Sequence, residues 1–124
     1  MPHKNLEAWK KSIDLVTEIY CITKKFPKEE LFGLTQQMRR SAVSIPSNIA
    51  EGCSRKNNSE TVQFLYIATS SLAELETQII ISNNVGYISK VDIEKILFDV
   101  DEIKRIIIGL IKSFKNKIIN TKSH

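Results

Sequence analysis

Residues that interrupt regular structure are scarce in this sequence. Its 124 residues include only 4 glycines, 3 prolines and 2 cysteines. The long runs rich in Ile, Leu, Glu and Lys contain almost no turn signals, which excludes a sheet of several short strands. The composition therefore predicts an all-α fold. A chain of this length forms a single domain, 1–124, that can bury a core without disulfides or metals.

Histidine is almost absent from the part of the chain expected to fold. His3 and His124 lie at the two ends, whereas a di-iron bundle needs Glu-x-x-His pairs inside it. Nucleophilic catalysis by Ser or Cys needs a positioned base, and no glycine-rich phosphate loop is present. We therefore expect no enzyme activity, no metal and no cofactor. Cys21 and Cys53 are interpreted as packing or surface thiols in a reduced compartment.

The sequence also lacks a long hydrophobic run. The longest one, 106–111, contains Gly109 and lies between Arg105 and Lys112, so it is far too short to span a bilayer. The opening residues show no signal-type segment. We expect a cytoplasmic protein without a membrane partner.

Apolar residues recur at helical spacing in four segments, predicted at about 6–25, 29–51, 58–84 and 90–118. Asn57 with Glu60, and Ser89 with Asp92, resemble helix-capping pairs, and Gly52 is placed for a left-handed C-terminal cap. Short links between the segments predict an antiparallel up-down-up-down four-helix bundle. The expected inner stripes are Leu6, Trp9, Ile13, Val16 and Tyr20 in the first helix, widened by Leu15, Ile19 and Ile22; Leu34, Met38, Ala42, Ile45 and Ile49 in the second; Leu65, Ala68, Leu72, Leu75 and Ile79 in the third; and Ile93, Ile96, Val100, Ile103, Ile107, Leu110 and Phe114 in the fourth.

Pro46 lies in the middle of the second segment. A proline inside a helix removes one backbone donor and crowds the carbonyl four residues earlier, at a cost of about 3 kcal/mol. We expect this central helix to be kinked at Pro46, with Ser44, Ser47 and Asn48 available to bond the freed backbone groups.

The fourth segment carries more apolar surface than one packing seam needs, which predicts an oligomer interface. The alternative is a frayed end whose apolar residues are tolerated. The residues outside the main stripe are Ile106, Ile108, Ile111, Ile118 and Ile119.

A polar constellation lies on the second and third helices. Two interpretations stay open: one of the two arginines pairs with Glu74 or Glu76 and fixes the bundle register, or an exposed arginine pair binds phosphate. The constellation comprises Arg39, Arg40, Ser44, Asn48, Glu51, Glu74 and Glu76.

Positive charge is concentrated at the C-terminal end of the chain. The net charge is +4, but from Lys104 onward there are bases and no acid. Singly, such charges form a solvated face; repeated around an oligomer, they can bind nucleic acid, because affinity grows with the number of phosphates contacted. No base-reading module is recognised. The candidate nucleic-acid-binding residues are Arg55, Lys56, Lys104, Arg105, Lys112, Lys115 and Lys117.

Two stretches carry a family resemblance, FPKEELFGLTQQMRRSAVSIPSNIAEG at 26–52 and FLYIATSSLAELETQI at 64–79. Over about residues 6–115 the chain resembles the bacterial four-helix-bundle proteins encoded in intervening sequences of large-subunit ribosomal RNA genes. This family includes the accessory variability determinants of diversity-generating retroelements. The resemblance implies a four-helix protomer, a homopentameric barrel, and binding of RNA or, in retroelement members, of nucleic acid and a reverse transcriptase.

The leading hypothesis is a non-enzymatic oligomeric bundle that binds RNA or another nucleic acid with low sequence specificity. The alternatives are a protein-interaction scaffold or accessory subunit for a partner such as a reverse transcriptase, and a purely structural oligomer whose charge serves solubility.

Overall fold

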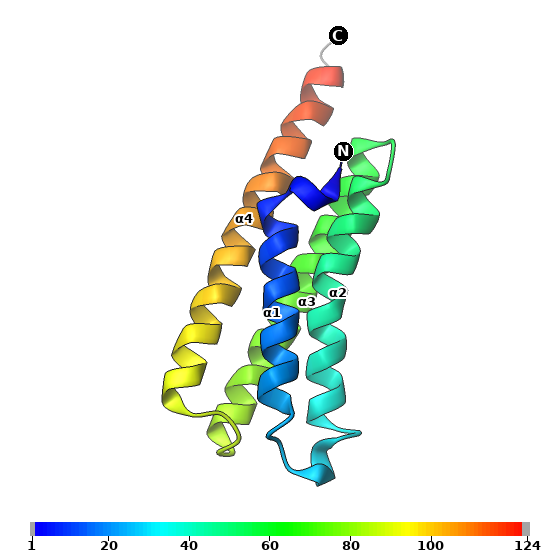
Figure 1. The fold of residues 1–124 in the computed structure, drawn as a ribbon. Helices are drawn as coiled ribbons and strands as arrows, with labels where there is room; N and C mark the ends of the chain where they lie inside the picture. The colour runs from blue at the N-terminus through cyan, green and yellow to red at the C-terminus, as the bar shows by residue number, and fades with distance from the viewer. Residues whose placement is uncertain (1, 123–124) are drawn as a thin grey trace.

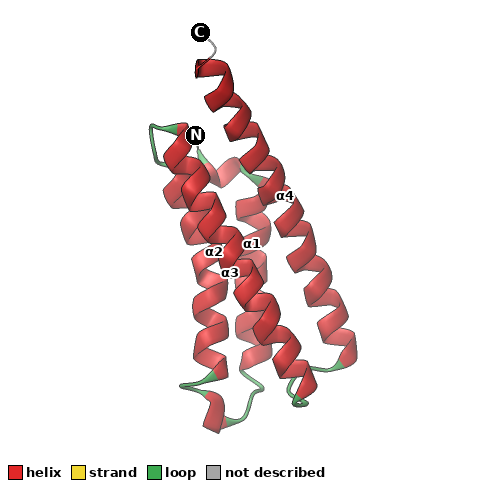
Figure 2. Ribbon diagram, turned by 180° about the vertical axis from the view of Figure 1, so that it is seen from behind, coloured by secondary structure: helices red, strands yellow, loops and turns green. Residues whose placement is uncertain are grey.

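The computed structural model describes residues 2–122, and every regular element within them is helical (Figure 1). Each helix runs antiparallel to the one before it, and contacts join every pair of neighbours around the bundle, including the first and the last (Figure 2). The all-α four-helix prediction is confirmed. The elements are the short 3-10 helix η1 (His3–Asn5), α1 (Glu7–Thr23), the 3-10 helix η2 (Lys28–Glu30), α2 (Leu34–Cys53), α3 (Asn58–Asn84) and α4 (Lys90–Lys122).

The expected caps define the start of α3 and of α4. Asn57 Oδ1 accepts hydrogen bonds from the backbone N–H groups of Ser59 at 2.7 Å and Glu60 at 3.3 Å. Ser89 Oγ accepts one from the backbone N–H of Asp92 at 3.1 Å. Both side chains satisfy donors that a helix leaves unpaired in its first turn. Both cap predictions are confirmed.

The second helix begins only at Leu34, whereas the sequence placed its start near residue 29. Glu30 is the last residue of η2, and its carboxylate bonds two other parts of the chain: Oε1 accepts from the N–H of Leu34, the first residue of α2, at 3.3 Å, and Oε2 accepts from the Tyr87 hydroxyl at 2.9 Å. These bonds hold the chain in a turn between η2 and α2. The turn contains Leu31, Phe32 and Gly33.

Gly52 is helical, so the prediction of a left-handed cap there is wrong. An added Cβ would lie 3.0 Å from Phe64 Cβ and 3.2 Å from the carbonyl oxygen of Thr61. The Thr61 hydroxyl also donates to the Gly52 carbonyl at 2.8 Å. Gly52 is therefore a point where α2 and α3 approach more closely than a side chain would permit.

The core follows the predicted stripes in α2, α3 and α4, but not in α1. On α1 the buried residues include Ala8, Ser12, Leu15 and Ile19, whereas Ile13 and Tyr20 are each 39% exposed. Ser12 can face the core because its hydroxyl donates to the Trp9 carbonyl at 2.8 Å, which satisfies it within its own helix. The buried stripe of α1 therefore includes Leu15 and Ile19, which were expected only to widen the predicted stripe, whereas part of the main predicted stripe borders α2 at the surface.

Helix α2 continues across Pro46, which is buried. Two of the expected side chains bond carbonyls in the turn before the proline: Ser47 Oγ donates to the Val43 carbonyl at 2.8 Å, and Asn48 Nδ2 donates to the Ser44 carbonyl at 2.7 Å. Neither bond reaches the Ala42 carbonyl, which the missing proline N–H leaves without its usual donor. These bonds stabilise carbonyls in the turn where the proline disturbs the regular ladder.

The bundle absorbs most of the apolar surplus of α4. Ile111 is only 5% exposed, and Ile106 and Ile118 pack against the core, which leaves Ile108 and Ile119 at 38% and 60% exposure. Exposed apolar side chains also lie on α3, which the sequence did not single out as an interface. These side chains are Tyr66, Ile67, Ile80 and Ile81.

Among residues 2–122, no helix combines the length and the apolar character needed to cross a membrane.

Candidate nucleic-acid interface

The candidate cations gather at one end of the bundle. In Figure 1 the C-terminal part of α4 and the link between α2 and α3 both lie at the upper end, and α4 projects beyond the other helices. On α4, Lys104, Arg105, Lys112 and Lys115 fall within about 100° of arc, because an α-helix turns 3.6 residues per turn. Lys117 lies on a different side of the helix. The first four therefore form one basic face about 16 Å long at 1.5 Å rise per residue.

These cations differ in their exposure and in whether a carboxylate already pairs with them. Lys104, Lys112 and Lys56 are exposed, and no carboxylate of the described residues lies within ion-pair distance of them. Arg105 Nε lies 3.2 Å from Asp101 Oδ2, but both side chains are more than 60% exposed. Such exposed pairs contribute little and exchange readily with another anion.

Arg55 is held more firmly. Its Nη2 lies 2.7 Å from Glu51 Oε1, and its guanidinium carbon lies 4.7 Å from the centre of the Phe64 ring. Glu51 neutralises part of the charge of this arginine, which makes it a weaker phosphate ligand than an arginine without a carboxylate partner. Sequence reasoning assigned Glu51 to a different cluster, although its i,i+4 spacing to Arg55 is a recognised signal for such a pair.

Aromatic rings support two of the α4 lysines. Lys115 Nζ lies 5.0 Å from the Tyr66 ring centre, and Lys117 Nζ lies 4.5 Å from that of Phe114. A cation over a ring face is stabilised by the ring quadrupole. The Phe114–Lys117 spacing of three residues was readable from the sequence, whereas Lys115 meets Tyr66 of α3 only in the folded bundle.

The polar constellation of α2 divides into two separate sets. Ser44 Oγ lies 2.8 Å from Ser71 Oγ of α3 and accepts from Asn48 Nδ2 at 2.9 Å, so these hydroxyls connect α2 to α3. Glu74 accepts from Ser41 at 3.2 Å instead of from an arginine. In the described part of the chain, Glu76 pairs with neither arginine either.

The two arginines themselves point elsewhere. Arg39 Nε donates to Thr23 Oγ1 at 2.9 Å, and its guanidinium carbon lies 4.6 Å from the Tyr20 ring centre on α1. Arg40 is exposed. The predicted arginine–glutamate pairing is therefore wrong, because the α2 face that carries Arg39 turns toward α1 and away from α3.

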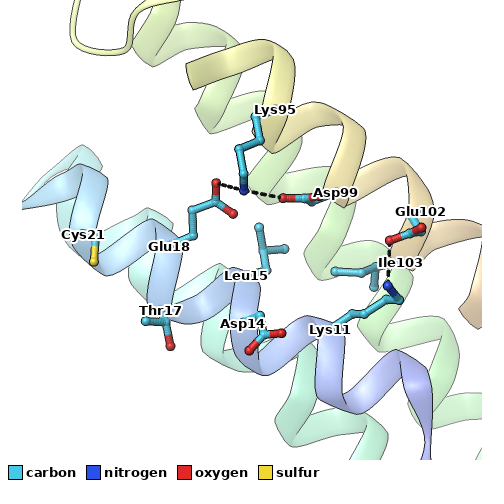
Figure 3. Close-up of a pocket in the computed structure, with 10 residues that line it drawn as sticks. All are labelled: Lys11, Asp14, Leu15, Thr17, Glu18, Cys21, Lys95, Asp99, Glu102 and Ile103. Carbon is cyan, nitrogen blue, oxygen red and sulfur yellow. Dashed lines mark hydrogen bonds and ion pairs between the residues drawn. The ribbon is translucent and has the colours of Figure 1, made fainter. Parts of the chain in front are cut away.

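A third polar region lies between α1 and α4, around a hollow of about 460 Å³ (Figure 3). Lys95 Nζ bridges Glu18 at 2.8 Å and Asp99 at 3.2 Å, and Lys11 Nζ reaches Glu102 at 3.1 Å. Hydrogen bonds to these carboxylates raise the pKa of both lysines. With Asp14 also in the lining, carboxylates outnumber lysines, so this groove repels a polyanion.

The described residues contain no cluster of metal-ligating side chains: no group of His, Cys, Asp and Glu in residues 2–122 is arranged to hold a metal ion. Burial raises the pKa of the Cys53 thiol, which favours its protonated, unreactive form. The arrangement supports binding chemistry through charges on a helical scaffold.

These features define a class: an all-α four-helix bundle whose last helix presents a basic face. The sequence model of a family described as 23S rRNA-intervening sequence protein matches residues 4–109. The chain belongs to this family.

A solved structure shares the fold. The chain is similar to a protein of unknown function from the S23 ribosomal protein family of Bacteroides thetaiotaomicron VPI-5482. The two are 27% identical, with a TM-score of 0.79, over 85% of this chain and 95% of the other. No curated protein matches the chain.

Proposed function

We propose that this protein is a non-enzymatic, oligomeric bundle that binds RNA or another nucleic acid with low sequence specificity. The observation that carries the proposal is the basic face of α4, where Lys104 and Lys112 are exposed and unmatched by any carboxylate of the described residues. At 3.4 Å per nucleotide along one strand, a 16 Å face spans about five phosphates. Membership of a family named for ribosomal RNA genes is consistent with an RNA ligand.

The proposed assembly is a homopentamer. Its support is the family resemblance together with the exposed apolar side chains on α3, where Ile67 and Ile81 are 47% and 46% exposed. No charged residue occurs from Thr61 to Ala73, so a second copy could cover the part of α3 around Ile67 without burying a charge of this helix. The exposed Glu74, seven residues from Ile67 and from Ile81, lies on the side of α3 that carries both isoleucines. Within the assembly, repetition of the α4 face would multiply the phosphate contacts. We also infer that Pro46 bends α2 to fit its neighbours.

Filter binding at rising salt tests the ligand. With a short structured RNA, four phosphate contacts give a log–log salt slope between about −3 and −4. Replacing Lys104 or Lys112 by Ala should weaken binding and reduce the slope by about one. Lys90→Ala, at the opposite end of the same helix, should leave both unchanged. Absence of binding even at low salt overturns the proposal.

Light scattering tests the assembly. The expected mass is five times the 14.2 kDa of one chain. Introducing a charge at Ile67 or Ile81, as Glu, should lower that mass, whereas Thr17→Glu on the exposed side of α1 should not. If the wild-type protein is monomeric, the proposed assembly is wrong. The filter-binding measurement then still tests RNA binding independently.

A further inference from the structure

The turn between η2 and α2 holds two large apolar side chains in solvent. Phe32 is 85% exposed and Leu31 is 50% exposed. Glu30 fixes this turn, because one carboxylate oxygen accepts from the first turn of α2 and the other from Tyr87 in the link between α3 and α4. The apolar side chains are therefore presented from a restrained backbone, which lowers the entropy cost of binding something there.

Two adjoining hollows flank this turn, at the end of the bundle opposite to the α2–α3 link (Figure 1). One measures about 460 Å³ and the other about 390 Å³, and Leu31, Thr35 and Arg39 line both. Their combined lining includes four cations and no carboxylate. The cations are Lys24, Lys28, Arg39 and Arg40.

The arginines occupy complementary positions in the larger hollow. Arg39 is oriented by its hydrogen bond to Thr23 and by its contact with the Tyr20 ring. Arg40 is exposed and lies within ion-pair distance of no carboxylate in residues 2–122. Arginine beside exposed aromatic and aliphatic side chains is the composition typical of the energetic centre of protein interfaces.

We propose that these hollows form a docking site for an acidic, amphipathic segment of a partner protein. A bulky apolar side chain of the partner would enter the hollow beside Phe32, and a carboxylate would pair with Arg40. The four cations and the missing carboxylates specify an acidic partner. The inference goes beyond nucleic-acid binding and uses the other end of the molecule.

The lining favours a protein segment over single-stranded nucleic acid. Leu31, Val43 and Pro27 form aliphatic walls that offer a polar base no hydrogen bonds. Arg39 already covers the Tyr20 ring, so Phe32 is left as the main open aromatic surface, whereas stacking platforms for single strands use successive rings.

Selection from a library of random displayed peptides tests the proposal on the full chain. Binders are selected on the wild-type protein and depleted on a double variant, Phe32→Ala with Arg40→Glu. We expect the selected peptides to combine acidic residues with a large apolar one. By fluorescence anisotropy, a labelled synthetic peptide from the selection should bind each single variant about tenfold more weakly or worse.

Two controls match the variants. Phe98→Ala removes another exposed Phe, which is 63% exposed on α4, and Lys104→Glu reverses a cation outside the hollows. Both should retain full peptide affinity. Because Phe32 and Arg40 are exposed, their variants should keep the wild-type circular dichroism and melting temperature.

Four results overturn the proposal. The first two are a selection that yields no peptides, and a selection whose peptides bind the variants as tightly as the wild-type protein. If oligouridine binds the wild-type protein and binds Phe32→Ala more weakly, the hollows belong to a nucleic-acid site. A loss of oligomer mass in the same variant would assign them to a second copy of the chain.

Discussion

Two helical glycines provide an internal test of how closely α2 and α3 approach. Gly52 faces Phe64 and Thr61, where an added Cβ would meet atoms at 3.0 and 3.2 Å. Gly109 lies inside α4 with no atom within 4 Å of the corresponding position. The substitutions Gly52→Ala and Gly109→Ala therefore make the same chemical change in opposite packing environments.

The two substitutions should change the free energy of unfolding in opposite directions, or by clearly different amounts. Alanine in place of a helical glycine contributes about 1 kcal/mol through lower backbone entropy in the unfolded chain. Gly109→Ala should therefore raise the free energy of unfolding by about that amount. At Gly52 the same gain is opposed by overpacking, which costs about 1–3 kcal/mol. Gly52→Ala should thus fall about 1–3 kcal/mol below Gly109→Ala.

Urea unfolding followed by circular dichroism measures this difference. Both variants are compared with wild type at one protein concentration, because an oligomer gains apparent stability with concentration. The m-values should be unchanged, since neither substitution alters the surface exposed on unfolding. Equal stabilisation by the two substitutions would refute the close approach of α2 and α3 at Gly52.

Three other features give independent predictions. Asn57→Ala should lower the free energy of unfolding by about 1 kcal/mol, because it removes the acceptor for two backbone donors of α3, and Asn57→Ser should restore most of it in the same urea assay. Pro46→Ala should lower the melting temperature if neighbouring helices are shaped around a bend; a higher melting temperature with unchanged mass contradicts that reasoning. At mildly alkaline pH a thiol reagent should label the exposed Cys21 in the native protein, whereas Cys53 should react only after unfolding, because burial raises its pKa. Equal labelling rates would contradict the burial.

Local signals in the sequence were sufficient to predict much of the fold. Asn57 and Ser89 could be recognised as caps because a capping side chain bonds only to residues in the next turn. The stripes of α2, α3 and α4 followed from apolar spacing alone, because their large aliphatic residues fall on one face. These features depend on neighbours along the chain and need no knowledge of tertiary contacts.

Features that depend on contacts between helices were missed. In α1, Ala8 and Ser12 are small enough to face the neighbouring helices, so the buried side is not the one with the largest residues. Gly52 looked like a cap because its partner, Phe64, is contributed by another helix. The same limit applied to the arginines: helical spacing placed Arg40 on one face with Ser44, but only the fold could show that Arg39 meets Tyr20 and Thr23.

Net charge is a weak guide to binding in this protein because its acids and bases are separated in space. The groove between α1 and α4 concentrates Glu18, Asp99 and Glu102, where they engage Lys11 and Lys95. When these paired charges are set aside, the remaining positive charges lie on the basic face of α4 and in the lining of the two hollows at the other end of the bundle. A net charge of +4 therefore understates the positive potential that a ligand meets at either place. Substitutions in the acidic groove should change bundle stability, whereas substitutions at the two cationic surfaces should change binding and leave the fold intact.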